Sequence, residues 1–306
     1  MKKPFPPADE LTRCLLHWGK TFDGNSGKFL PALIHMLDVG LVVKTLLKKE
    51  CLLKGALSKF SRCLGMSKDN TIRYVSLLAS LHDVGKISFD FQNGVPDLFH
   101  HAGTQGYDSP LRRTGSASDE KVWHQQTSAA SLTRELRAEL GFAGNIDQIL
   151  SFSKVICGHH GYFEDFKRLD AFIPDTESKN VNTERWSADR ATAFKALLAA
   201  FNPGSRPRPP AKYDEGFYTD FCVMCTALVI IGDWIASGRK EFSTPFDRAM
   251  VESGDWTETG WRALVRERQK LANTAIDLSG WGVSYVKTKG EPTAEWFKET
   301  LGVGDT

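Results

Sequence analysis

The sequence has little that would mark a secreted or membrane protein. Its six cysteines are scattered over 306 residues without the spacing of a disulfide framework, which is typical of a reducing cytoplasm. The N-terminus, MKKPFPPADE, lacks the apolar stretch of a signal peptide. The most apolar segment, 221–237, is shorter than the roughly 20 residues of a membrane span and contains Asp233. We therefore expect a cytoplasmic protein in which this segment is a buried helix.

A strong charge of either sign is also missing. The formal net charge is +2, and 25% of the residues are charged, so any nucleic-acid partner must be bound by a local site rather than by the overall field. The apolar content of 41% is ordinary for a globular protein with a sizeable core. Alternating strand patterns are scarce as well, which argues against a sheet-based fold.

Helical periodicity is what the sequence has in abundance. It predicts an all-α fold, a compact helical bundle with long loops. Serine at 187 is a plausible N-cap and Gly141 a plausible C-cap. The predicted helices cover residues 30–49, 71–86, 124–141, 145–161, 187–202, 217–237 and 256–280.

Seven histidines and aspartates fall on the inward faces or at the ends of five of these helices. A single inward histidine is more often a hydrogen-bonded core residue than a ligand, and a single aspartate usually caps or pairs. Together, however, they form a large set of buried polar groups that one or two metal ions would satisfy at once. The set consists of His35, His82, Asp83, His124, His159, His160 and Asp233.

These residue types favour transition metals over magnesium. Imidazole prefers Mn, Fe, Co or Ni to Mg, and a carboxylate such as Asp83 can bridge two ions. Two ions roughly 3.5–4 Å apart can activate water and bind a phosphate. Lys86, three residues after Asp83 on nearly the same helix face, could neutralise developing phosphate charge; otherwise it is a solvated lysine at the end of a helix.

Six ordered motifs resemble one known family. They are HWGK (17–20), HMLDVG (35–40), LHDVGKISFDFQ (81–92), HQQTSA (124–129), GHHGYF (158–163) and GDWIAS (232–237). The H-D-x-G-K element is that of the HD phosphohydrolase superfamily. The wider pattern resembles the HD nuclease domain of the CRISPR-associated helicase–nuclease of type I systems, most closely the type I-E branch, although Gly232 replaces the usual alanine.

The resemblance implies a two-metal nuclease that cuts single-stranded DNA by metal-activated water during interference against foreign DNA. One ion would take His35, His82, Asp83 and Asp233, and the other Asp83, His124, His159 and His160. His82, Asp83 and Lys86 would be catalytic, and Ser237 would touch the substrate. The alternative from the short motif alone is a phosphohydrolase acting on a nucleotide or cyclic dinucleotide; a third alternative is an interaction module without enzymatic activity.

The resemblance also suggests how the chain is organised. Residues 1–280 would form the HD nuclease domain, and 281–306 resemble the connector that leads to a helicase. The sequence has no G-x-x-x-x-G-K-[ST] phosphate loop and no acidic helicase box, so we expect no ATPase or helicase activity from this chain. It would be either a stand-alone subunit or an excised domain, recruited by a CRISPR surveillance complex or a separate helicase.

Overall fold

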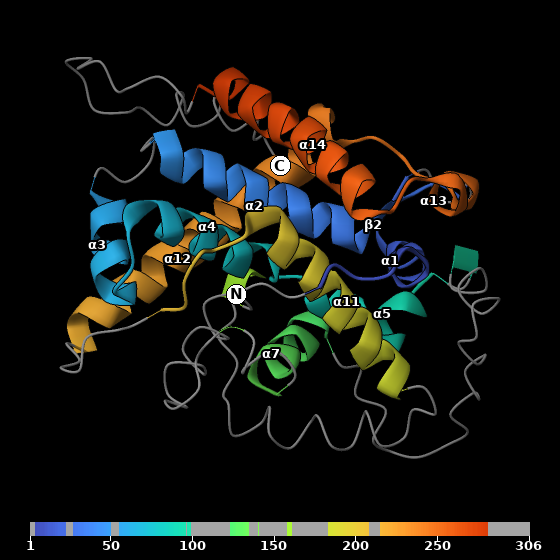
Figure 1. Ribbon diagram of the computed structural model, residues 1–306, viewed down its shortest axis with the longest axis horizontal. Helices are drawn as coiled ribbons and strands as arrows, with labels where there is room; N and C mark the ends of the chain where they lie inside the picture. Colours follow the sequence, from blue (N-terminus) through green and yellow to red (C-terminus); the bar gives the residue numbers. More distant parts are fainter. Residues whose placement is uncertain are drawn as a thin grey trace, which may run out of the picture.

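Most of the predicted helices are present in a computed structural model of the chain, which describes residues 4–22, 27–49, 55–95, 97–98, 123–134, 140, 158–160, 183–207 and 215–280. Within these ranges the regular structure is helical apart from one short hairpin (Figure 1). The all-α prediction is therefore confirmed. Most of the predicted helix 145–161, the cap at Gly141 and the tail 281–306 lie outside the described residues.

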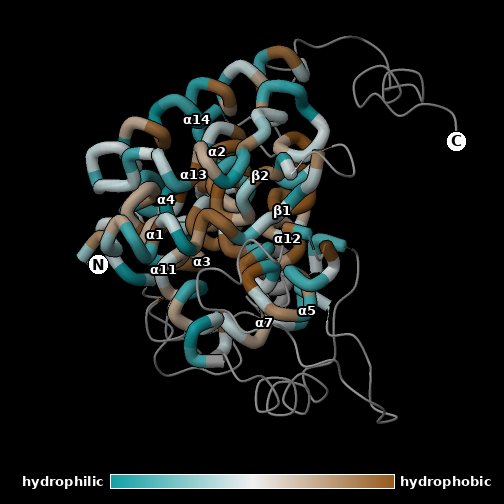
Figure 2. The backbone as a smooth tube through the Cα atoms, turned by 90° about the vertical axis from the view of Figure 1, so that its right-hand side faces the viewer, coloured by the Kyte–Doolittle hydropathy of each residue, from teal (hydrophilic) through white to brown (hydrophobic). Residues whose placement is uncertain are grey.

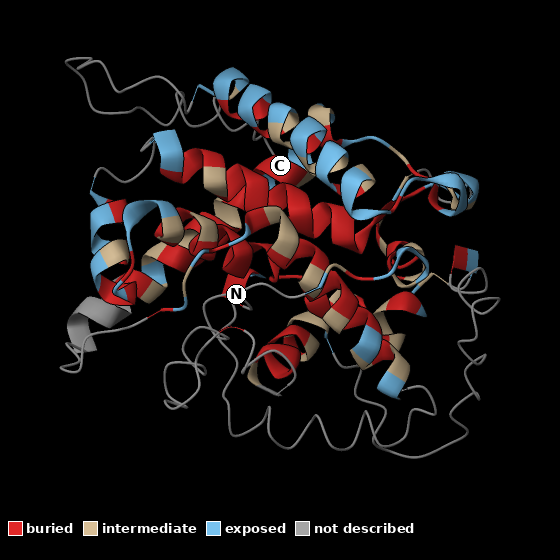
Figure 3. Cartoon of the chain, viewed as in Figure 1, coloured by how far each residue is buried: buried red, intermediate tan, exposed pale blue. Residues whose placement is uncertain are grey.

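Helix α2 (Ala32–Lys49) is the central element of the bundle. It packs against α4 (Lys68–Ser80), α12 (Glu215–Gly238) and α14 (Glu258–Leu278). All its residues except three lysines are buried, and Figure 3 shows it mostly in the colour of buried residues, with one exposed end. The periodicity of residues 30–49 predicts an amphipathic helix, with one buried face. The helix is instead buried on nearly every side because other helices surround it.

The remaining helices lie around this centre. Hydrophobic stretches gather in the interior, whereas the outer helices carry hydrophilic turns (Figure 2). The short helices α1 and α3 were not predicted from the sequence. The outer elements are α1 (Ala8–Leu15), α3 (Ala56–Leu64), η1 (Val84–Lys86), α5 (Phe89–Gln92), α7 (His124–Arg134), η2 (Gly158–His160), α11 (Thr183–Phe201), η3 (Lys240–Phe242) and α13 (Arg248–Ser253).

Helix α11 begins earlier than the sequence predicted. Its first residue is Thr183, so Ser187 lies inside the helix and is not its N-cap. The extra turn contains Trp186, which is buried with its ring 5.1 Å from that of His17. Burial of this large side chain favours extending the helix beyond the capping serine.

The hairpin is the one departure from helical structure among the described residues. Strands β1 (Trp18–Thr21) and β2 (Phe29–Pro31) pair in antiparallel fashion. An isolated bridge joins Phe29 to Phe246, with backbone nitrogen-to-oxygen distances of 2.9 and 2.8 Å. β1 also contacts α2, at the beginning of that helix.

Helix α12 contains the apolar segment noted in the sequence. Its residues Phe221–Gly238 are long and apolar enough to cross a membrane by length and composition, but the helix packs against α2, α3 and α4. A Cβ atom at Gly232 would lie 2.8 Å from Val43 Cγ2 and 3.4 Å from Val39 Cγ1. The glycine at this position therefore lets α12 approach α2 closely.

Candidate metal centre

The His82–Asp83 doublet follows α4 rather than ending it. α4 stops at Ser80, and Asp83 is the N-cap residue of η1. The connecting turn is held by i+3 hydrogen bonds, from His82 N–H to the Ala79 carbonyl (3.2 Å) and from Lys86 N–H to the Asp83 carbonyl (2.9 Å). The predicted helix 71–86 is thus too long, because the chain tightens into a 3₁₀ turn.

Gly85 lets helix α7 approach this turn. A Cβ atom at Gly85 would lie 1.9 Å from the His124 carbonyl oxygen and 2.5 Å from the Ser128 backbone nitrogen. The Gly85 N–H also donates to Ser128 Oγ at 2.8 Å. The glycine of the H-D-x-G-K element is therefore needed for packing, since any side chain would push away the helix that carries His124.

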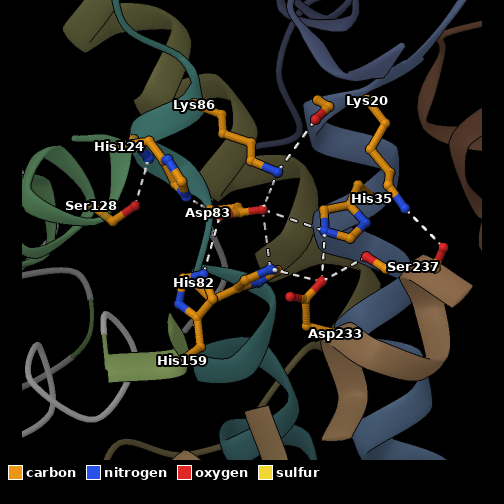
Figure 4. Close-up of polar contacts among 12 residues, drawn as sticks. Lys20, His35, His82, Asp83, Lys86, His124, Ser128, His159, Asp233 and Ser237 are labelled. Atoms are coloured by element: carbon orange, nitrogen blue, oxygen red, sulfur yellow. Dashed lines mark hydrogen bonds and ion pairs between the residues drawn. The ribbon is translucent and has the colours of Figure 1, made fainter. Parts of the chain in front are cut away.

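The Asp83 carboxylate is the centre of the cluster (Figure 4). Its Oδ2 atom lies 3.3 Å from His35 Nε2, 3.2 Å from His82 Nε2 and 2.6 Å from Lys86 Nζ. Its Oδ1 atom lies 3.3 Å from His124 Nε2 and 3.6 Å from His159 Nε2. Asp83 is buried, so its two oxygens face two different sets of imidazoles inside the protein.

Asp233 supplies a second carboxylate from α12. Its Oδ1 atom lies 3.1 Å from His35 Nε2 and 3.9 Å from His82 Nε2. The Ser237 hydroxyl, one turn later, donates to the same oxygen at 3.0 Å. Ser237 thus contacts a cluster residue directly, whereas its expected contact with a substrate stays a prediction.

The hydrogen bonding of His82 fixes its tautomer. Its Nδ1 atom lies 3.0 Å from the Ala79 carbonyl oxygen, which can only accept, so Nδ1 carries the proton. In the neutral ring, Nε2 then presents a lone pair toward the Asp83 carboxylate. His82 Nε2 and Asp83 Oδ1 are buried atoms without a well-formed hydrogen bond in the described part of the chain. A cation between a lone pair and a carboxylate would satisfy both.

The group formed by His124, His159 and His160 lies nearer the surface than His35 and His82. His159 is buried, His124 is partly exposed and His160 is exposed. The Nε2 atoms of His124 and His160 are 3.2 Å apart. Two imidazole nitrogens at this separation match two ligands of one ion with metal–nitrogen bonds of about 2.0–2.1 Å.

The electrostatics of the cluster keep both carboxylates ionised. Burial raises the pKa of Asp83, but His82 in its protonated form, the Lys86 ammonium and the His124 and His35 imidazoles that contact the carboxylate bring it well below its usual value. Burial likewise raises the pKa of Asp233, and the hydrogen bond from His35 brings it below its usual value. For His35, burial lowers the pKa, but its bonds to the two carboxylates raise it overall.

The donor atoms fit a metal centre. The His35, His82 and Asp83 donor atoms lie within 4.8 Å of one another, and so do those of two other groups: His124, His159 and His160, and His82, His159 and Asp233. All seven residues expected as ligands therefore occur in one cluster, and their role as ligands stays a prediction. His17, which the motif pattern left out of the ligand set, lies outside it, with Nε2 2.9 Å from Asp189 Oδ2.

Two further residues at the site had no role assigned from the sequence. Ser128 joins α7 to η1, as described above. Lys20 of β1 donates from Nζ to the Ser237 carbonyl oxygen at 2.8 Å. Partial burial lowers the pKa of the Lys20 ammonium, although the nearby Asp233 carboxylate raises it. Both residues lie inside motifs that the sequence displays, HQQTSA and HWGK, but their contacts arise only from the tertiary fold.

A helical bundle with a His/Asp cluster built on an H-D doublet defines an HD-domain protein. The family model described as "Cas3, HD domain" matches residues 18–242. The chain belongs to this family.

Known proteins extend the comparison over nearly the whole chain. The chain is 25% identical over 285 residues to the "CRISPR-associated endonuclease/helicase Cas3" of Thermus thermophilus, covering 92% of this chain and 27% of the relative. It thus spans about a quarter of that curated relative.

Two solved structures share the fold. A structure titled "Crystal structure of CRISPR-associated protein" matches with a TM-score of 0.70 and 22% identity, covering 95% of this chain and 29% of the other. The Thermus thermophilus Cas3 HD domain, solved in the presence of Ni²⁺, matches with a TM-score of 0.58 and 20% identity over 88% of this chain and 92% of that domain.

Proposed function

We propose that the chain is a metal-dependent nuclease that hydrolyses phosphodiester bonds of single-stranded DNA. The observation that carries this proposal is the position of Asp83, whose two carboxylate oxygens face separate groups of imidazoles. A carboxylate with this arrangement suits a bridge between two cations. Membership of the Cas3 HD family supports nucleic acid as the substrate.

Each proposed ion has a donor set. One set comprises His35, His82, Asp83 and Asp233, and the other comprises Asp83, His124, His159 and His160. Imidazole-rich sets favour Mn, Fe, Co or Ni over Mg. Bound ions of this kind supply Lewis acidity, which activates water and stabilises charge on a phosphate during hydrolysis.

The protein's own residues contribute orientation and charge. The bond from His82 Nδ1 to the Ala79 carbonyl holds the ring with Nε2 directed into the cluster. Lys86 places a positive charge 2.6 Å from Asp83 Oδ2, at the edge of the cluster, where it would pair with a phosphate oxygen. Because these groups recognise phosphate rather than base edges, we expect little sequence preference.

The exposed side of the cluster indicates where DNA would approach. His160 is exposed and His124 partly exposed, whereas His35 and His82 are buried. A strand approaching from the side of His124 and His160 would reach the proposed ions without opening the core.

We further infer that the chain acts in the cytoplasm with a partner, and that residues 1–280 form its nuclease unit. The curated relative is named an endonuclease/helicase, and this chain covers 27% of it. A separate helicase or a CRISPR surveillance complex would then deliver single-stranded DNA. Co-purification and cross-linking with candidate partners test this inference, and the absence of any such complex would contradict it.

Cleavage of circular single-stranded DNA by metal-stripped protein tests the proposed activity. Mn²⁺, Co²⁺, Ni²⁺ or Mg²⁺ is added back to the wild type and to Asp83→Asn. We expect transition metals to restore cleavage, and the variant to lose more than about 100-fold, the upper end of losses seen when partners of metal ligands are removed. Asp277→Asn is the control, because this exposed carboxylate pairs with Lys49 in the last turn of α2.

Parallel assays with nucleotides and cyclic dinucleotides separate the two candidate substrates. Hydrolysis of a nucleotide without cleavage of DNA would replace the proposal with that of a small-molecule phosphohydrolase. No hydrolysis of any substrate with any metal would contradict both.

A further inference from the structure

Strand β1 contacts three elements that carry or directly adjoin proposed metal ligands. A Cβ atom at Gly19 would lie 2.7 Å from Ala32 Cα, at the beginning of α2. Gly19 O accepts a hydrogen bond from Lys86 Nζ of η1 at 3.3 Å. The next residue, Lys20, donates to the Ser237 carbonyl of α12 at 2.8 Å. α2 carries His35, η1 follows Asp83 directly, and α12 carries Asp233.

The bond from Lys20 acts at the C-terminal end of α12. The last four carbonyls of a helix lack partners within the helix, and a cation there is favoured by the helix dipole. The Lys20 ammonium satisfies one of these carbonyls, that of Ser237. The hydroxyl of the same serine donates to Asp233 Oδ1 at 3.0 Å. Figure 4 shows Lys20, Ser237 and Asp233 in this order beside His35.

We propose that Lys20 is a positioning residue that holds the last turn of α12, and with it the Asp233 carboxylate, at a fixed place relative to Asp83. The proposal rests on the metal-binding function proposed above. It gives a physical role to the H-W-G-K motif, whose residues 18–20 lie in β1. Without the ammonium, the final turn of α12 would lose its link to β1, and the Asp83–Asp233 separation would vary.

The geometry favours positioning over contact with DNA. The Lys20 ammonium already bonds a backbone carbonyl, and the residue is half-buried. This bond directs the ammonium to the end of α12 rather than to the carboxylates of the cluster. Lys86, by comparison, contacts Asp83 directly and so lies in the cluster itself.

Metal titration of Lys20→Met and Lys20→Arg tests the proposal without measuring activity. Methionine keeps the length and apolar stem of the side chain but removes the donor. We expect calorimetry with Mn²⁺, and the visible spectrum with Co²⁺, to show one of two ions bound 10- to 100-fold more weakly, the usual effect of losing a group that orients a metal ligand. Arginine retains a donor and should restore most of the affinity. The melting temperature of each metal-free variant shows that it is folded.

Lys240→Met is the matched control. Lys240 is an exposed lysine at the beginning of η3, two residues beyond the end of α12. The Lys240→Met variant loses one positive charge near the same helix end but keeps the bond from Lys20 to Ser237, so its metal affinity should equal that of the wild type. An equal loss in Lys240→Met would show that charge alone is responsible and would overturn the positioning role.

Ser237→Ala provides a second test that does not require Lys20→Met to fold. If Lys20 acts through the turn that Ser237 occupies, Ser237→Ala should weaken binding of the same ion. Where both single variants fold, the double variant should lose less affinity than the product of the two effects. Full metal affinity in both single variants would overturn the proposal. Failure of the wild type to bind any transition metal would instead refute the proposed function, so the two failures are distinguishable.

Discussion

Replacing Arg268 with methionine should cost about 3–5 kcal/mol of stability, the range for breaking a buried ion pair by removing one partner. Arg268 of α14 donates from Nε to Asp38 Oδ1 of α2 at 2.7 Å, and from a terminal nitrogen to Oδ2. Asp38 is fully buried and Arg268 is 4% exposed. Methionine keeps much of the apolar stem, so the loss comes mainly from the unpaired carboxylate.

The loss should depend on pH. Burial raises the pKa of Asp38 and Arg268 lowers it, leaving it above the ordinary 3.8; without Arg268 it should rise further. The native variant then binds a proton at pH values where the unfolded chain does not. Its stability therefore falls as pH rises through the window above the ordinary aspartate value. Lowering the pH toward that value should reduce the deficit relative to the wild type.

Urea unfolding of metal-free protein, followed by circular dichroism, measures this effect. The double variant Asp38→Leu with Arg268→Met removes both charges, and it should be more stable than Arg268→Met alone because no unpaired carboxylate remains. A loss below about 1 kcal/mol for Arg268→Met, the level of an exposed ion pair, would show that the buried pair contributes little. A double variant less stable than the single one would contradict the role of the unpaired carboxylate.

Two further predictions concern close packing and buried thiols. Gly85→Ala should displace α7 and lower the free energy of unfolding by about 1–3 kcal/mol, as overpacking does, and it should also weaken metal binding by His124, His159 and His160. Gly238→Ala is the control and should match the wild type, because no atom lies within 4 Å of its Cβ position. Equal urea midpoints for the two variants would contradict the prediction. Cys14 and Cys225 should resist a thiol reagent at pH 8 in the native state and react after unfolding, because burial raises the pKa of both; rapid native labelling of either would contradict their burial.

The sequence predicts the long helices well because their apolar periodicity reports a buried face. It does not predict β1, since a four-residue strand such as Trp18–Thr21 is too short to show an alternating pattern. The end of α4 was also misplaced. Apolar residues continue through Val84, but the chain tightens after Ser80 so that Gly85 can meet α7.

The sequence predicts which residues gather in the cluster, but it does not predict the hydrogen bonds that hold the surrounding elements in place. His35 and Asp233 are polar residues on apolar helices, a pattern that is visible without a structure. The bond from Lys20 to Ser237 joins residues 217 positions apart, and the bond from Gly85 to Ser128 joins residues 43 positions apart. Neither follows from local pattern, because each depends on how whole elements pack.

Anomalous diffraction from crystals grown with Mn²⁺ would show whether Asp83 bridges two metal ions, as proposed. We expect two anomalous peaks on opposite sides of the Asp83 carboxylate, each with one of its oxygens at roughly 2.0–2.2 Å, the range of carboxylate bonds to zinc. One peak would be bonded to His35 and Asp233, and the other to His124 and His160. A single ion, or ions that leave Asp83 without a metal bond, would contradict the proposed bridge.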